Sequence, residues 1–172
     1  MGEELESSSM GFSEKISLFI KSRRNILKIV LFIVVVIIGF NMRNILVVVT
    51  GSETPIAVIH GYSMYPLLRE GDLVFAYKPP PDHIKVGDII IYEGLNGKLV
   101  IHRVIAVKIV NGKYYYVTKG DNNELPDIYQ FSGPGRIGIP YDRVKGVVIS
   151  FNHTVVKIPY LGYLSIWYHG EG

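Results

Sequence analysis

The feature that most limits how this chain can fold is a long apolar run close to its start. Residues 29–40 read IVLFIVVVIIGF without one polar side chain, and residues 45–49 add ILVVV. Residues 29–49 make a stretch of 21 residues, which as a helix spans the roughly 30 Å hydrocarbon core of a bilayer. The intervening Arg43 must then extend to the membrane interface or face a partner helix.

Three interpretations of this run compete. A cleaved secretory signal peptide is disfavoured because the charged start is long and no small-residue cleavage site follows at once. A buried core helix is disfavoured because the run is apolar on every side rather than along one stripe. A membrane helix fits best. Basic residues gather before it, whereas Arg43, near its far end, is the only one from there until Arg69. The preceding ones are Lys15, Lys21, Arg23, Arg24 and Lys28.

The positive-inside rule turns this charge asymmetry into a domain organisation. We predict a polar cytoplasmic N-terminus over residues 1–25, one transmembrane anchor over residues 26–50, and an extracytoplasmic domain over residues 51–172. The protein is therefore expected to cross the cell membrane once, or the endoplasmic reticulum membrane if the organism is eukaryotic. The lipid bilayer is its first predicted partner.

The remainder of the chain has the pattern of a mainly β domain. Short runs of β-branched and aromatic residues are bounded by Gly, Pro, Asn or Asp, which predicts strands at residues 56–60, 72–77, 88–92, 99–110, 113–118 and 144–151. Asn111-Gly112 is typical of a two-residue hairpin turn. We expect one helical turn at residues 64–69 and a stiff extended connector at residues 79–81 (PPP). Residues 155–168 are predicted either to lie at the membrane surface or to close the core.

Composition excludes several function classes. A hydrophobic content of 48% with 19% charged residues is not that of a disordered chain, and a net charge of +3 gives no argument for nucleic-acid binding. The absence of cysteine excludes disulfides, cysteine-ligated metals and a cysteine nucleophile. The five histidines show no metal-ligand spacing. We expect no cofactor, no metal and no nucleic-acid partner.

Ser63 is the strongest candidate for chemistry. It follows a predicted strand and sits between Gly61, which permits a tight bend, and Pro66. A serine at such a junction can lie beside free backbone N–H groups, where it can act as a nucleophile. Most serines in turns, however, only cap or bond locally.

The segment around Ser63 resembles the serine motif of type I signal peptidases, Gly-x-Ser-Met-x-Pro-x-Leu, at residues 61–68. Residues 51–56 (GSETPI) are similar to the segment that precedes this motif in the endoplasmic-reticulum and archaeal branch. Four more family segments follow in the family's order, at residues 71–74 (GDLV), 86–90 (VGDII), 102–105 (HRVI) and 118–123 (TKGDNN). The resemblance covers roughly residues 51–151. It implies a signal-peptidase-like β domain preceded by one transmembrane helix.

The resemblance assigns roles to particular residues. Ser63 matches the nucleophile, and His102 stands where bacterial enzymes have the lysine base, which places the chain in the serine–histidine branch. A mostly neutral imidazole can take the serine proton and return it to the leaving amine. The alternative for His102 is a packed strand histidine, and His60, three residues before Ser63, is the rival base.

A carboxylate that orients the histidine is also expected. The resemblance gives this role to Asp127 and a supporting role to Asp121, although Asp121 also fits a simple turn residue. Relatives often have an acidic pair at the positions of Pro126 and Asp127. Many relatives also carry a serine at the position that Gly61 occupies here. The hydroxyl of that serine donates a hydrogen bond to the oxyanion. Here the Ser63 N–H is the expected donor, and a second donor is not identified.

The resemblance implies a membrane-anchored serine endopeptidase that cleaves signal peptides from preproteins after small residues. Ile59 and Met64, close to Ser63 in sequence, are predicted to line the substrate pocket, although as core residues they would look the same. Partner subunits are also expected. Two alternatives remain: a related membrane protease with other clients, and a non-catalytic β-rich binding module of a secretion complex.

Overall fold

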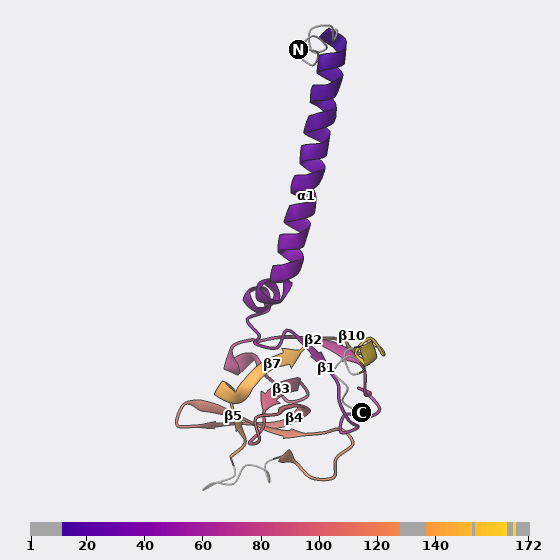
Figure 1. The fold of residues 1–172 in the computed structure, drawn as a ribbon. Helices are drawn as coiled ribbons and strands as arrows, with labels where there is room; N and C mark the ends of the chain where they lie inside the picture. The colour runs from indigo at the N-terminus through magenta and orange to yellow at the C-terminus, as the bar shows by residue number, and fades with distance from the viewer. Residues whose placement is uncertain (1–11, 128–136, 153, 165–166, 168–172) are drawn as a thin grey trace. The chain divides into compact units, whose positions relative to one another are not determined.

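The computed structural model describes residues 12–127, 137–152, 154–164 and 167. The chain divides into two compact units, and the boundary lies between Asn44 and Ile45. The first unit is helical, and the second holds the strands (Figure 1).

Helix α1 (Phe12–Thr50) runs through the whole apolar stretch without a break. It begins earlier than the predicted anchor of residues 26–50. The polar tetrapeptide at residues 41–44 stays helical, and the Asn41 amide donates to the Ile37 carbonyl at 2.9 Å, one turn back. The segment Asn25–Thr50 has 26 residues and a mean hydropathy of 2.4, long and apolar enough to cross a membrane. Most of its residues are exposed and none is buried, so it is not a core helix of this chain.

The second unit is built on antiparallel strands. Within the described residues, eight strands form one sheet in the order β1-β2-β7-β3-β4-β5-β6, with β10 paired to β2, and β8 pairs separately with β9. The strands are β1 (Ile56–Val58), β2 (Leu73–Tyr77), β3 (Ile89–Glu93), β4 (Leu99–Val110), β5 (Lys113–Lys119), β6 (Ile139–Pro140), β7 (Val144–Val148), β8 (Ser150–Phe151), β9 (Thr154–Val155) and β10 (Lys157–Ile158).

The mainly β expectation is confirmed, with differences at the ends of elements. The predicted strand at residues 144–151 is two strands: β7 pairs with β2 and β3, whereas β8 pairs with β9 in a separate sheet. A 3-10 turn (Pro81–His83) begins inside the proline run, and a second one (Tyr141–Arg143) precedes β7. The expected helical turn is present, since Leu68 N–H donates to the Met64 carbonyl at 2.9 Å.

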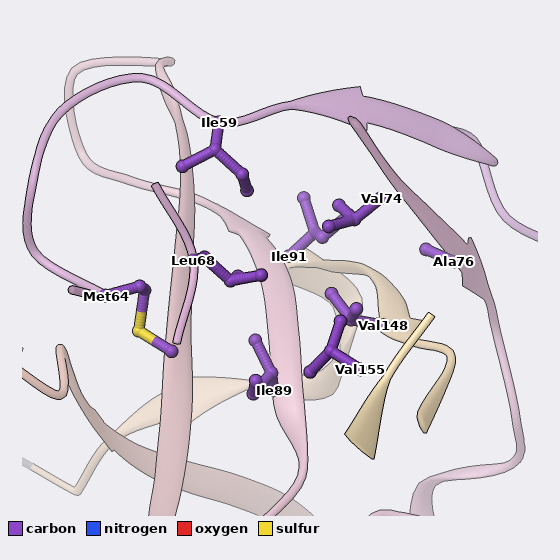
Figure 2. Close-up of a cluster of buried hydrophobic side chains, with 9 residues drawn as sticks. All are labelled: Ile59, Met64, Leu68, Val74, Ala76, Ile89, Ile91, Val148 and Val155. Carbon is purple, nitrogen blue, oxygen red and sulfur yellow. The ribbon is translucent and has the colours of Figure 1, made fainter. Parts of the chain in front are cut away.

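Strand β3 carries the core on both of its faces. Its side chains alternate, so Ile89 and Ile91 join one buried cluster while Ile90 and Tyr92 join another. The first cluster contains Ile59, Met64 and Leu68 from the loop that bears Ser63 (Figure 2). Val155 packs in this cluster, whereas most described side chains after it are exposed. Among the described residues of the stretch 155–168, Val155 is thus the one that joins this core cluster.

The register of the sheet fixes which side chains share a face. His102 on β4 lies opposite Ile90 of β3, and Val104 lies opposite Thr118 of β5. Residues directly opposite each other, and residues two apart on one strand, share a face. His102, Val104 and Thr118 therefore lie on the same face of the sheet. A register shift between β4 and β5 follows Val104.

Candidate active site

Ser63 lies in a cleft of about 500 Å³. The walls come from β1 with the residues that follow it, and from the start of β4. Among its lining residues are Ile56, Ile59, His60, Met64, Leu99 and Ile101. Ser63 itself is half-buried, whereas Ile59 and Met64 are almost wholly buried and also belong to the core. The cleft thus has an apolar wall, and Ser63 is among the residues that line it.

The loop of residues 61–68 presents Ser63 through its backbone conformation. Gly61 has φ +82°, a left-handed conformation that favours glycine, and it turns the chain after β1. The Tyr65 N–H then donates to the Tyr62 carbonyl, and the Leu68 N–H to Met64. Within the described residues, the Ser63 N–H donates no hydrogen bond. It is therefore free to bind an anionic oxygen, as an oxyanion donor must.

A second group of polar side chains lies buried near the start of β4. The Nδ1 atom of His102 lies 2.6 Å from Oδ2 of Asp127, and both side chains are almost wholly buried. When the carboxylate accepts from Nδ1–H, the other ring nitrogen, Nε2, is left as the basic one. The structure therefore places Asp127, rather than Asp121, against His102.

Two neighbours of this pair were not among the residues expected from sequence. Thr118 Oγ1 donates to Asp127 Oδ2 at 2.6 Å, and the Tyr92 ring meets the His102 ring edge-on at a centroid distance of 6.4 Å. Burial raises the pKa of the Tyr92 phenol, and the charge of Asp127 raises it further. Thr118 opens the matched segment of residues 118–123, which is the only sequence signal that could have drawn attention to it.

Asp121 has a different partner. Its two carboxylate oxygens accept from Arg103 Nε and Nη2 at 2.8 and 2.7 Å, and Arg103 also donates to the Gly87 carbonyl at 2.9 Å. The hydrogen bond to Asp121 is the main cause that raises the pKa of Arg103. Asp121 thus fastens the loop after β5 to the strand that carries His102.

The loop that follows β5 also touches the serine segment. The Asn122 N–H donates to the Ser63 carbonyl at 2.8 Å, and the Asn122 side-chain amide donates to the Tyr62 carbonyl at 3.2 Å. Within the described residues, however, no hydrogen bond joins the Ser63 hydroxyl to His102. Catalytic hydrogen bonds are often long before a substrate is bound.

The remaining histidines form no second centre in the described ranges. His60 is exposed and lines the cleft, and His83 lies 3.9 Å from the exposed Asp82. His153 and His169 lie outside the described residues. Among the described residues, no three or more His, Cys, Asp or Glu side chains form a cluster that could hold a metal.

Several known proteins are similar to this chain, although no family model matches it. Signal peptidase complex catalytic subunit SEC11 of Candida tropicalis is 31% identical over 130 residues, 74% of either chain. SEC11 of Plasmodium falciparum is 32% identical over 127 residues, 72% of this chain and 64% of that protein. Human SEC11C is 42% identical over 84 residues, 48% of this chain and 44% of that protein. The chain thus spans less than two thirds of the length of the last two.

Proposed function

Because this chain belongs to the family of signal peptidase complex catalytic subunits, we propose that it is a membrane-anchored serine endopeptidase that cleaves signal peptides from secreted preproteins after small residues. One observation carries the proposal: a buried His102–Asp127 pair at 2.6 Å, in a domain whose cleft presents Ser63. A histidine oriented by a carboxylate is what a serine needs to become a nucleophile.

In the proposed reaction, Ser63 Oγ attacks the carbonyl carbon of the scissile peptide bond. His102 Nε2 accepts the hydroxyl proton, while Asp127 holds Nδ1–H and stabilises the imidazolium. The tetrahedral intermediate collapses, the C–N bond breaks, and Nε2 returns the proton to the leaving amine. Water then attacks the acyl-enzyme by the same proton route, which releases the signal peptide and restores Ser63.

The developing oxyanion is assigned to the Ser63 N–H, which donates no other hydrogen bond in the described part of the chain. Gly61 offers no hydroxyl for this purpose, and the second donor stays unassigned. Each such donor contributes roughly 10²–10³ in rate. The cleft suits an extended substrate, because β1 forms one of its walls. β1 is an edge strand of the sheet and can pair with a peptide backbone. Ile59 and Met64 would then limit the size of the side chains that enter.

Helix α1 supports the membrane part of the proposal. Residues 26–50 would anchor the chain, with residues 1–25 in the cytoplasm and residues 51–172 outside, as the basic residues before the span favour. The membrane would be the cell membrane, or that of the endoplasmic reticulum in a eukaryote. An enzyme and a substrate held in one bilayer meet at a high effective concentration.

Partner subunits are part of the proposal, because the similar proteins are named as subunits of a complex. Arg43 lies inside the apolar span, where a polar group on a partner helix would stabilise its charge. Two alternatives share this fold: a protease with other clients, and a binding module without catalysis. The buried histidine–carboxylate pair favours an enzyme over the binding module.

The test uses the purified full-length protein and a preprotein inserted in the same membrane. We expect the wild type to release the mature protein and Ser63→Ala to release none, with an unchanged thermal transition because Ser63 is only half-buried. Thr154→Ala, at an exposed position of β9, is the matched control and should cleave like the wild type. Cleavage that persists in Ser63→Ala would remove the protease assignment from this site.

A further inference from the structure

The carboxylate oxygen that faces His102 has a second donor. Asp127 Oδ2 lies 2.6 Å from His102 Nδ1 and also accepts from Thr118 Oγ1 at 2.6 Å. Hydrogen bonds to an ionised carboxylate are short and strong. Two donors on one oxygen restrict the rotation of the carboxylate, since a rotation that moves Oδ2 away from both donors breaks both bonds.

We propose that Thr118 is a positioning residue, whose hydroxyl holds Asp127 Oδ2 on His102 Nδ1 and so keeps Nε2 as the nitrogen that accepts the Ser63 proton. This inference rests on the proposed function. Thr118 does not reach the substrate in this scheme, and it acts through the carboxylate alone.

The fold places Thr118 for this task. It pairs with Val104 across β4 and β5, two residues from His102, and it lies on the same face of the sheet. Thr118 is completely buried, as Asp127 nearly is. A β-branched side chain has few χ1 rotamers on a strand, so the hydroxyl is held in place before any substrate arrives.

The surroundings of His102 explain why orientation matters here. Tyr92 approaches from β3 and Thr118 from β5, and both are neutral groups, since the pKa of the Tyr92 phenol is raised by burial. Arg103, next along β4, is engaged by Asp121. Among the described residues, Asp127 is thus the charged group that touches the imidazole. If its carboxylate turns, no other charged group among the described residues is in contact with the imidazole to select the Nδ1–H tautomer.

The experiment compares Thr118→Val, which keeps the shape and removes the donor, with Thr118→Ser, which keeps the donor. Full-length variants are assayed for preprotein cleavage, and histidine ring ¹⁵N spectra report the tautomer of His102. Tyr116→Phe is the matched control. It removes another buried hydroxyl from β5, one that donates to the Pro81 carbonyl at 2.7 Å. Thr118→Ala is prepared in parallel in case the valine variant does not fold.

We expect Thr118→Val to lower kcat about ten- to a hundredfold with little change in KM, as loss of an outer partner of a catalytic group does. Its spectrum should show a mixture of tautomers in place of one. Thr118→Ser should restore most of the rate, and Tyr116→Phe should match the wild type in both measurements.

Two results would overturn the inference. One is a wild-type tautomer and rate in both Thr118→Val and Thr118→Ala. The other is an equal loss in Thr118→Val, Thr118→Ser and Tyr116→Phe, which indicates general damage to the strand. Failure of the proposed function would look different. A wild-type protein that cleaves no preprotein rejects the peptidase, while the tautomer comparison still decides whether Thr118 orients the His102–Asp127 pair.

Discussion

At the scale of single residues, the two aspartates after β5 have separate tasks. Asp127 is buried against His102, whereas Asp121 forms a more exposed ion pair with Arg103. Sequence spacing alone does not separate them, because both follow His102 and lie six residues apart. The two aspartates differ in burial. That difference depends on the path of the loop after β5, which the sequence spacing does not give.

We predict a large difference between substitutions at these two positions. Asp127→Asn should lower kcat by about 10³–10⁴, because an amide can hold the imidazole in the wrong tautomer. Asp121→Asn should cost less than about 1 kcal/mol in the free energy of unfolding, since exposed ion pairs contribute little, and should leave most of the activity. Steady-state rates and thermal denaturation of both variants check this. A larger rate loss for Asp121→Asn would reverse the assignment.

At the scale of elements, the loop after β5 ties the serine segment to the histidine strand. Asn122 bonds to the Ser63 carbonyl, and Asp121 bonds to Arg103 beside His102. Gly120 begins this loop and is buried. A Cβ atom there would lie 2.6 Å from the Ser63 carbonyl oxygen, which is too close for any carbon to remain.

Gly120→Ala is therefore expected to displace either this loop or the serine segment, and to reduce cleavage strongly in a protein that still folds. The control is Gly112→Ala in the β4–β5 hairpin. Its added Cβ meets nothing within 4 Å, although its φ of +74° costs about 1 kcal/mol in backbone strain. The control should lose some thermal stability and keep its cleavage rate. Equal rates in the two variants would show that the contact with Ser63 does not matter.

The elements themselves were largely predictable, and the reasons are local. β4 and β5 begin and end close to where β-branched runs and Asn111-Gly112 place them, because turn chemistry acts over a few residues. The division of residues 144–151 into β7 and β8 was not predictable, since β7 pairs with β2 and β3, which are distant in sequence, whereas β8 pairs with β9. Thr118 was not predicted as a site residue for the same reason. Its contact with Asp127 forms only when the chain folds.

At the scale of the whole molecule, the account requires that the two ends of the apolar helix lie on opposite sides of a membrane. The chain has no cysteine, so single introduced cysteines can be labelled without background. We predict that in sealed vesicles or cells Lys113→Cys, at an exposed position, reacts with an impermeant maleimide from outside. Ser7→Cys should react only after the membrane is opened. Labelling of both positions from the same side would exclude the proposed topology.

The central claim is that Ser63 is activated by His102, and one measurement tests it most directly. This is the initial rate of cleavage of a membrane-inserted preprotein by full-length wild type and by His102→Ala, followed over pH. We predict a wild-type rate that declines toward the acid end of the pH range, because a protonated imidazole cannot accept the Ser63 proton. His102→Ala should be slower by at least about 10³ at every pH. A wild-type rate that is flat over this range, or an alanine variant that cleaves as fast, would contradict the account.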